Sequence, residues 1–314
     1  MRVVFLGSPP FALPVFERLL GSRHSVLALV AQPDRPRGRG MKVEPSPLVE
    51  CARARGLPVL QPENTRDPGF AGSLRPLKAD VLLVASYGEI LRQDVLSLCP
   101  QGALNVHASL LPRHRGASPI QAAILAGDAE TGVSVQRMVL RLDAGDVLLE
   151  ERTPIGPQET AGELLARLAV LGGEAAVRAL DLLESGRARF QPQDESRATQ
   201  ARKIHKQQGR IDWARPAHEI ERLVRALNPW PLARAGDGRG GEIAVLAARV
   251  LAEAQADWKG AEPGMLLAAQ GLCVACGSGA LELLRVKPAG KGEMDGPDWL
   301  RGARLARGAR LANG

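Results

Sequence analysis

The chain has 314 residues, 45% of them hydrophobic and 24% charged, and a length above about 250 residues favours two domains with separate cores. Its formal net charge is +7. All of the excess lies in residues 187–314, which hold 21 Lys and Arg against 14 Asp and Glu, while residues 1–186 hold 20 of each. The first segment, MRVVFLGSPP, has too short an apolar run to begin a signal peptide or membrane helix, so we expect a soluble cytoplasmic protein.

Short apolar runs alternate with amphipathic stretches through the first half of the chain. In order they are VVFLG, FALPVFERLLGS, VLALVAQ, PLVECARARG, DVLLVASY, GALNVHASLL and ASPIQAAILAG. Runs that are apolar on both faces and separated by helices predict a mostly parallel sheet covered on both sides, hence a Rossmann-like α/β domain. The first turn, Gly7-Ser8-Pro9-Pro10, lacks the GxGxxG spacing, and its prolines remove backbone donors, which disfavours dinucleotide binding.

A cationic segment, DRPRGRGMK, follows the second predicted strand at residues 34–42. Its glycines and proline exclude a regular helix. By itself such a charge run indicates a solvated loop.

The segment NVHASLLP ends a predicted parallel strand. Asn105 and His107 are alternate residues of that strand, so they project from one face at the sheet edge where open α/β folds bind ligands. About 35 residues later, Asp143 lies in the polar turn LDAGD between two predicted strands. Strand-end histidines and turn aspartates are usually structural. Together, however, the three supply an oxyanion donor, a proton carrier and an orienting anion, the set needed for acyl transfer.

The remainder of the chain predicts a long helix, a linker and a small barrel. Leucines and alanines at three- and four-residue spacing predict a helix over residues 159–186, and the polar stretch after it has no periodic apolar face. Short Gly-interrupted strands then predict an OB-like β-barrel. We expect domains at 1–189 and 207–314, joined by a linker at 190–206. The four cysteines are too few for a disulfide framework, and we expect Cys273 and Cys276 to pack inside as reduced thiols.

The stretch NVHASLLPRHRGASPIQAAILAGDAETGVS, followed by RLDAGDVL, resembles the 10-formyltetrahydrofolate-dependent formyltransferases. The resemblance continues through RVVFLGSPPFA, QPDRPRGRGMK, ASYGEIL, RIDW, NPWPLA and LRVKPAGKG, and so covers nearly the whole chain. It implies that Asn105, His107 and Asp143 form the catalytic set and that 10-formyltetrahydrofolate is the co-substrate, with no metal. It also implies folate-binding roles for Ser109, Leu110, Leu111, Pro112, Tyr87 and Gly88.

The formyl acceptor is indicated by two features outside the catalytic set. In family members that act on initiator methionyl-tRNA, a loop like DRPRGRGMK enters the acceptor-stem groove, and the basic C-terminal barrel has no counterpart in stand-alone nucleotide formyltransferases. The resemblance therefore implies a tRNA partner and a monomer. The residues expected to contact tRNA are Arg35, Arg37, Arg39, Lys42, Lys203 and Lys206.

Three alternatives compete with this interpretation. A dinucleotide oxidoreductase lacks its glycine fingerprint, and a pure RNA-binding module leaves the catalytic set unexplained. An amino-sugar formyltransferase also carries a C-terminal domain, but DRPRGRGMK and NPWPLA argue against it. One departure from the family is His114, where Trp or Tyr is common, and we expect it to be a surface variation.

Overall fold

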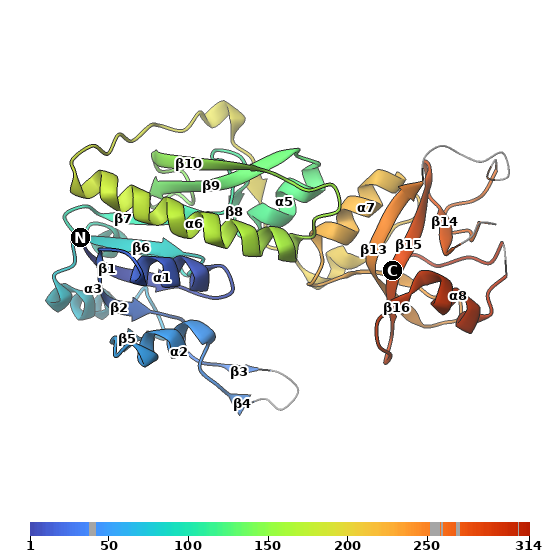
Figure 1. Cartoon of the computed structure of the whole chain (residues 1–314), viewed down its shortest axis with the longest axis horizontal. Helices are drawn as coiled ribbons and strands as arrows, with labels where there is room; N and C mark the ends of the chain where they lie inside the picture. The colour runs from blue at the N-terminus through green and yellow to red at the C-terminus, as the bar shows by residue number, and fades with distance from the viewer. Residues whose placement is uncertain (38–41, 252–257, 259, 268–270, 307) are drawn as a thin grey trace. The chain divides into compact units, whose positions relative to one another are not determined.

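The computed structural model describes residues 1–314 except 38–41, 252–257, 259, 268–270 and 307. The described chain divides into two compact units, and each is described by itself (Figure 1). The first consists of residues 1–119, 129–154 and 164–202, and the second of residues 120–128, 155–163 and 203–314. Residues 190–202 of the predicted linker thus cluster with the first unit. The domain limits at 189 and 206 stay predictions.

A seven-stranded sheet forms the centre of the first unit, in the order β10-β9-β7-β6-β1-β2-β5. Its strands are β1 (Arg2–Gly7), β2 (Ser25–Val30), β5 (Val59–Leu60), β6 (Val81–Ala85), β7 (Ala103–His107), β9 (Glu130–Arg137) and β10 (Val147–Pro154). The five strands from β7 to β5 run parallel. Strand β9 runs antiparallel to both of its neighbours, β7 and β10. The predicted Rossmann-like, mostly parallel sheet is confirmed.

Helices cover both faces of this sheet because its strands are apolar on both sides. They are α1 (Ala12–Leu20), α2 (Pro47–Ala54), α3 (Pro68–Leu74), α4 (Gln93–Leu96) and α6 (Ala161–Glu184), with a 3-10 turn η1 (Arg75–Leu77) after α3. On one face, the Phe5 ring lies 5.0 Å from that of Phe16 in α1, and α6 runs beside α1 (Figure 1). On the other, Val4 and Leu6 pack with residues of α3 and α4. Successive residues of β1 therefore fill two separate apolar layers.

Two small strand pairs were not expected from the sequence. Strand β3 (Pro36–Arg37) pairs with β4 (Lys42–Val43) in antiparallel fashion. Strand β8 (Arg115–Gly116) pairs in parallel with β11 (Gln200–Ala201), shortly after the 3-10 turn η2 (Glu195–Arg197). Pairs of two residues leave no periodic signal in the sequence.

A curled antiparallel sheet builds the second unit, as the predicted OB-like barrel requires. Its strands are β12 (Ala233–Gly236), β13 (Glu242–Leu251), β14 (Cys273–Ala275), β15 (Ala280–Pro288) and β16 (Met294–Asp295). Around it lie α7 (Ala217–Ala226), α8 (Gly296–Ala303) and the 3-10 turn η3 (Lys206–Gly209), while α5 (Pro119–Ala126) falls largely in the same unit. Helix α8 was not predicted, although Pro297 near its start is a helix-start signal. Cys273 and Cys276 are buried as expected.

Candidate active site

Four polar side chains share one face of the sheet where β7 meets β9. Asn105 lies opposite Gln136, and His107 lies opposite Ser134. Directly opposed residues of an antiparallel pair point to the same side. His107, Ser134 and Gln136 are all buried, at 6%, 0% and 1% exposure. Polar groups rarely occupy such positions unless they are hydrogen-bonded to one another or to a ligand.

Asp143 reaches this face from the turn between β9 and β10. Its backbone has a left-handed φ of 49°, a conformation that Asp tolerates better than most residues. Two residues later, a Cβ on Gly145 would collide with the carbonyl oxygen of Arg137. The turn therefore requires glycine there in order to fold the Asp143 carboxylate back over β7 and β9.

The Asp143 carboxylate is held mainly by neutral donors. Its Oδ1 accepts hydrogen bonds from Gln136 Nε2 at 3.1 Å and, more weakly, from Asn105 Nδ2 at 3.4 Å. Its Oδ2 accepts one from the backbone N–H of Gly116 at 2.8 Å and lies 3.7 Å from His107 Nδ1. The three predicted catalytic residues, from β7 and the β9–β10 turn, thus lie together. The carboxylate and the imidazole are near neighbours, but longer than hydrogen-bond distance apart.

His114 is not the surface variation that we expected, because it is only 6% exposed. Its left-handed backbone, with φ of 56°, turns the chain back toward β7. There its carbonyl oxygen lies 3.0 Å from His107 Nε2. Since a carbonyl oxygen only accepts, Nε2 is the protonated ring nitrogen in this contact. The Nδ1 edge of His107 is therefore the one that faces Asp143.

The predicted folate-binding segment follows β7 directly. Ser109 is fully buried, and its hydroxyl donates to the carbonyl oxygen of Arg113 at 2.6 Å. Ser134 ties the segment to β9, because its hydroxyl donates to the Ser109 carbonyl and accepts from the Leu111 N–H. Leu110 and Pro112 are half-buried, and the Leu111–Pro112 peptide is cis. The segment is thus a fixed turn at the carboxyl edge of the sheet.

Tyr87 and Gly88 lie at the same edge, after β6. The Tyr87 carbonyl accepts hydrogen bonds from Ser8 Oγ at 3.2 Å and Gln32 Nε2 at 2.9 Å. Its ring is 2% exposed and packs in an apolar cluster, so burial raises the pKa of its hydroxyl. No partner for that hydroxyl is found among the residues that the structure describes. A buried phenol of this kind is a candidate hydrogen-bond donor for a ligand.

The residues predicted to contact tRNA come from both units. Arg35 is exposed beside the β3–β4 pair, whose backbone includes Arg37 and Lys42. Lys203 and Lys206 are exposed in the second unit. Arg39 lies outside the described residues.

Sequence reasoning missed a polar network behind Asp143. Arg115, 1% exposed, donates to Gln193 and forms a two-point contact with Glu195. These hydrogen bonds lower the pKa of the Glu195 carboxyl. Gln193 in turn contacts Gln136. The sequence signal concerns only Gln136, because the strand GVSVQ alternates apolar and polar residues and so places Ser134 and Gln136 on one face.

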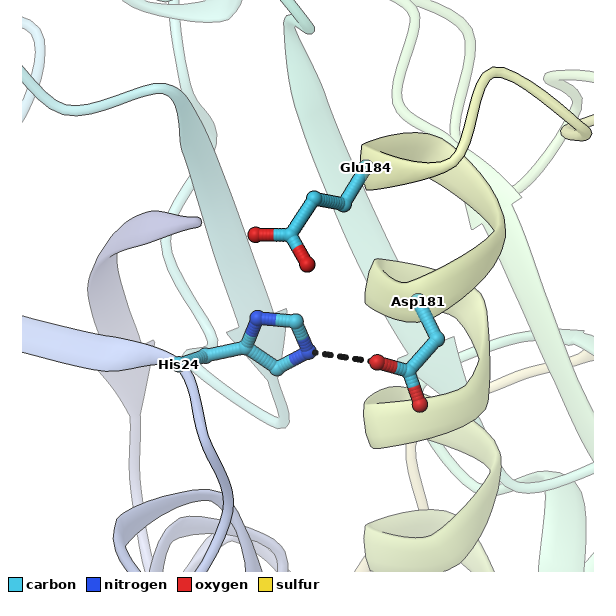
Figure 2. A group of neighbouring side chains, drawn as sticks. All are labelled: His24, Asp181 and Glu184. Atoms are coloured by element: carbon cyan, nitrogen blue, oxygen red, sulfur yellow. Dashed lines mark ion pairs between the residues drawn. The ribbon is translucent and has the colours of Figure 1, made fainter.

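A second histidine cluster, His24 with Asp181 and Glu184, has the composition of a metal site (Figure 2). Its carboxylates, however, already bind cations. Arg23 contacts Asp181 at 2.8 Å and Glu184 at 2.7 Å, and the Met1 nitrogen donates to Glu184 at 2.6 Å. The Met1 nitrogen also lies 3.0 Å from His24 Nδ1, so this ring nitrogen already has a partner, and desolvation lowers the pKa of His24. The cluster is therefore a charge-balanced ion-pair network that joins β2 to α6.

Comparisons with known proteins identify both parts of the chain. Residues 1–180 match the family model described as formyl transferase, and residues 203–304 match that of the formyl transferase C-terminal domain. A methionyl-tRNA formyltransferase from Roseiflexus castenholzii is 45% identical over 313 residues, which covers 99% of each chain.

Solved structures share the fold at low sequence identity. HypX from Aquifex aeolicus in complex with tetrahydrofolic acid is 18% identical with a TM-score of 0.65, and the match covers 98% of this chain and 48% of that one. An N-formyltransferase from Helicobacter canadensis in complex with folinic acid and dTDP-3-aminofucose is 14% identical with a TM-score of 0.65, covering 90% and 98%. At these identities the likeness concerns the fold.

Proposed function

The chain belongs to the formyl transferase family, and we propose that it transfers the formyl group of 10-formyltetrahydrofolate to the α-amino group of initiator methionyl-tRNA, producing N-formylmethionyl-tRNA for translation initiation. The acceptor follows from the relative that is 45% identical over nearly the full length of both proteins. The observation that carries the chemistry is the group of Asn105, His107 and Asp143 at the carboxyl edge of the sheet. Side chains supply both the oxyanion donor and the proton carrier, so the reaction requires no metal ion.

Asn105 is the oxyanion donor in this mechanism. The neutral α-amine attacks the formyl carbon, which gives a tetrahedral intermediate with a negative oxygen and a positive nitrogen. An amide NH₂ carries two hydrogens, and Asp143 takes at most one of those on Asn105. The second donates to the oxyanion, an interaction that typically stabilises the transition state by about 3 kcal/mol.

His107 and Asp143 act on the positive charge of the intermediate and on the transfer of the amine proton. His107 Nε2 faces the His114 carbonyl, so its Nδ1 edge, 3.7 Å from Asp143, is the one that can turn toward the reacting atoms. The carboxylate attracts a proton on that nitrogen and the cationic amine of the intermediate alike. Acting through water, Asp143 then carries the proton from the amine to the departing folate nitrogen.

Folate and tRNA have separate sites in this proposal. The turn Ser109–Pro112, with Tyr87 and Gly88, holds the folate, because these segments end neighbouring parallel strands. Arg35, Arg37, Arg39 and Lys42 contact the acceptor stem, while Lys203 and Lys206 contact the RNA backbone. Phosphate contacts need positive charge more than rigid fit.

We further propose that the enzyme acts as a cytoplasmic monomer. The catalytic set comes from one copy of the chain. Among the described residues, no helix combines the length and the hydropathy needed to cross a membrane.

The proposed activity is tested by incubating the purified protein with 10-formyltetrahydrofolate and charged initiator tRNA. We expect N-formylmethionine to be recovered after the ester is hydrolysed. An amino-sugar nucleotide serves as the competing acceptor. Formylation of the sugar nucleotide with none on the methionyl-tRNA would overturn the assignment.

The RNA contacts are tested by replacing exposed cations. Arg35→Ala, Lys203→Ala and Lys206→Ala should each weaken tRNA binding and reduce the slope of log affinity against log salt by about one. The matched control is Arg75→Ala, because Arg75 is also exposed but lies before β6, at the amino edge of the sheet. Unchanged salt slopes in the three variants would contradict the proposed RNA surface.

A further inference from the structure

The turn that carries Asp143 is held from outside by the side chain of Gln193. Its Nε2 donates to the carbonyl oxygen of Asp143 at 2.9 Å and to that of Gly145 at 2.7 Å. An amide NH₂ has two hydrogens, so this one group satisfies both carbonyls. Gln193 is 50 residues away from Asp143 in the sequence, and it clamps the turn that places the carboxylate.

The orientation of Gln193 is fixed by Arg115. The Oε1 of Gln193 accepts hydrogen bonds from Arg115 Nε at 3.0 Å and Nη2 at 2.8 Å. A guanidinium only donates and backbone carbonyls only accept, so the amide has one orientation that satisfies both sides. Arg115 is itself buried and is held by Glu195 at 2.9 and 3.1 Å.

Gln193 also acts on the carboxylate through Gln136. The Nε2 of Gln193 lies 3.3 Å from Gln136 Oε1, and Gln136 Nε2 donates to Asp143 Oδ1 at 3.1 Å. Both hydrogens of this NH₂ are directed at the two carbonyls of the turn, so the contact with Gln136 is a shared and weaker one.

We propose that Gln193 is a positioning residue for Asp143 in the formyl-transfer step, an inference that rests on the proposed function. It acts on the backbone of the turn directly and on the carboxylate through Gln136. Without its amide, the turn loses two hydrogen bonds and Asp143 is no longer fixed relative to His107. Displacements of about 1 Å at a reacting group lower rates by roughly 100-fold. Since the amide of Gln193 is occupied by Arg115 and by the two carbonyls of the turn, we expect its effect to fall on kcat.

The kinetic test compares Gln193→Ala with Gln193→Glu. The glutamate keeps the size of the side chain and the acceptor for Arg115, but loses the NH₂ donor. We expect both variants to lower kcat by roughly 10- to 100-fold while KM for each substrate changes less than about threefold. The matched control is Gln191→Ala, because Gln191 belongs to the same segment and has an exposed side chain. Normal kcat in both Gln193 variants would overturn the proposal.

A double-mutant cycle with Asp143→Asn separates positioning from a general structural role. If Gln193 acts through Asp143, Gln193→Ala should lower kcat by less than about threefold in the Asp143→Asn background. An equal loss in both backgrounds would overturn the proposal, because it would show that Gln193 acts elsewhere.

Hydrogen exchange of the turn gives a readout that does not depend on activity. Amides of residues 141–146 should exchange faster in Gln193→Ala than in wild type or Gln191→Ala, while those of β1 and β6 keep their protection. Unchanged exchange in the turn would refute the clamp even if the protein had a different substrate. Conversely, faster exchange in a protein that leaves methionyl-tRNA unformylated would refute only the proposed function.

Discussion

Two buried histidines of the first unit, His107 and His24, each lie beside a carboxylate, and their surroundings differ. His24 Nε2 is 3.3 Å from Asp181, whereas His107 Nδ1 is 3.7 Å from Asp143. The Asp181 side chain is 38% exposed and pairs with Arg23, while that of Asp143 is 9% exposed and is held by amide N–H groups. The shorter of the two distances thus belongs to the pair whose charge is already balanced. Figure 2 shows this pair, His24 and Asp181.

The difference shows that a His–Asp distance says little about catalysis on its own. A carboxylate compensated by a guanidinium has little attraction left for a further positive charge, and exposure screens what remains. A carboxylate held by neutral dipoles keeps its full negative charge in a site of low dielectric. In the proposed mechanism Asp143 therefore stabilises positive charge that develops during the reaction, whereas Asp181 stabilises the attachment of β2 to α6.

The largest expected contrast is between His107→Ala and His24→Ala. Loss of a side chain that takes part in acid–base catalysis typically lowers rates by 10²- to 10⁴-fold, so we expect kcat/KM to fall roughly 10³-fold in His107→Ala. His24→Ala should stay within about threefold of wild type in activity but melt at a lower temperature, because it leaves buried space and breaks the ion-pair network. Formylation rates and melting curves of both variants check this.

The comparison would break down if the two variants lost activity equally. It would also break down if His107→Ala were active but unstable. Gln is the matched replacement at both positions, since it retains a hydrogen-bonding group without titrating. It should restore the stability of the His24 variant and leave the His107 variant slow.

A smaller loss of activity is expected from Asn105→Ala. Removal of one oxyanion donor raises the barrier by about 3 kcal/mol, which corresponds to roughly 10²-fold in kcat. The matched control is Asp181→Asn, which also changes a polar neighbour of a buried histidine but should keep the wild-type rate. If Asn105→Ala raised KM with kcat unchanged, Asn105 would bind substrate and transition state equally, contrary to its proposed role.

Much of the first unit could be predicted from local sequence patterns, whereas the features that depend on long-range contacts could not. The buried strands appear as apolar runs, and the period of two placed Asn105 and His107 on one face at a strand end. Asp143 was a candidate only in combination with these two residues, because a turn aspartate is usually structural, and the family resemblance then implied its role in formyl transfer. Gln193 could not be found from the sequence, because its partners lie 48 to 78 residues away and its own segment has no periodicity. The same reason hid the burial of His114.

The smallest expected effect concerns the pH dependence of stability at His24. Desolvation, the largest cause, lowers the pKa of His24 in the folded state, and the nearby Met1 nitrogen and Arg23 lower it further against the opposing pull of Asp181 and Glu184. An unfolded histidine titrates near about 6.5. As the pH falls below that value, the unfolded chain gains a proton that the folded chain does not, so the contribution of His24 to stability is present above about pH 6.5 and is lost below it.

We expect the amides of β1 and β2, the strands beside His24, to lose protection between pH 7.5 and 5.5 in wild type and to lose less in His24→Phe. The control is His218→Phe, because His218 is exposed in the second unit, and it should behave as wild type. An identical loss in His24→Phe and wild type would mean that His24 titrates equally in both states, and the contrast with His107 would then rest on activity alone.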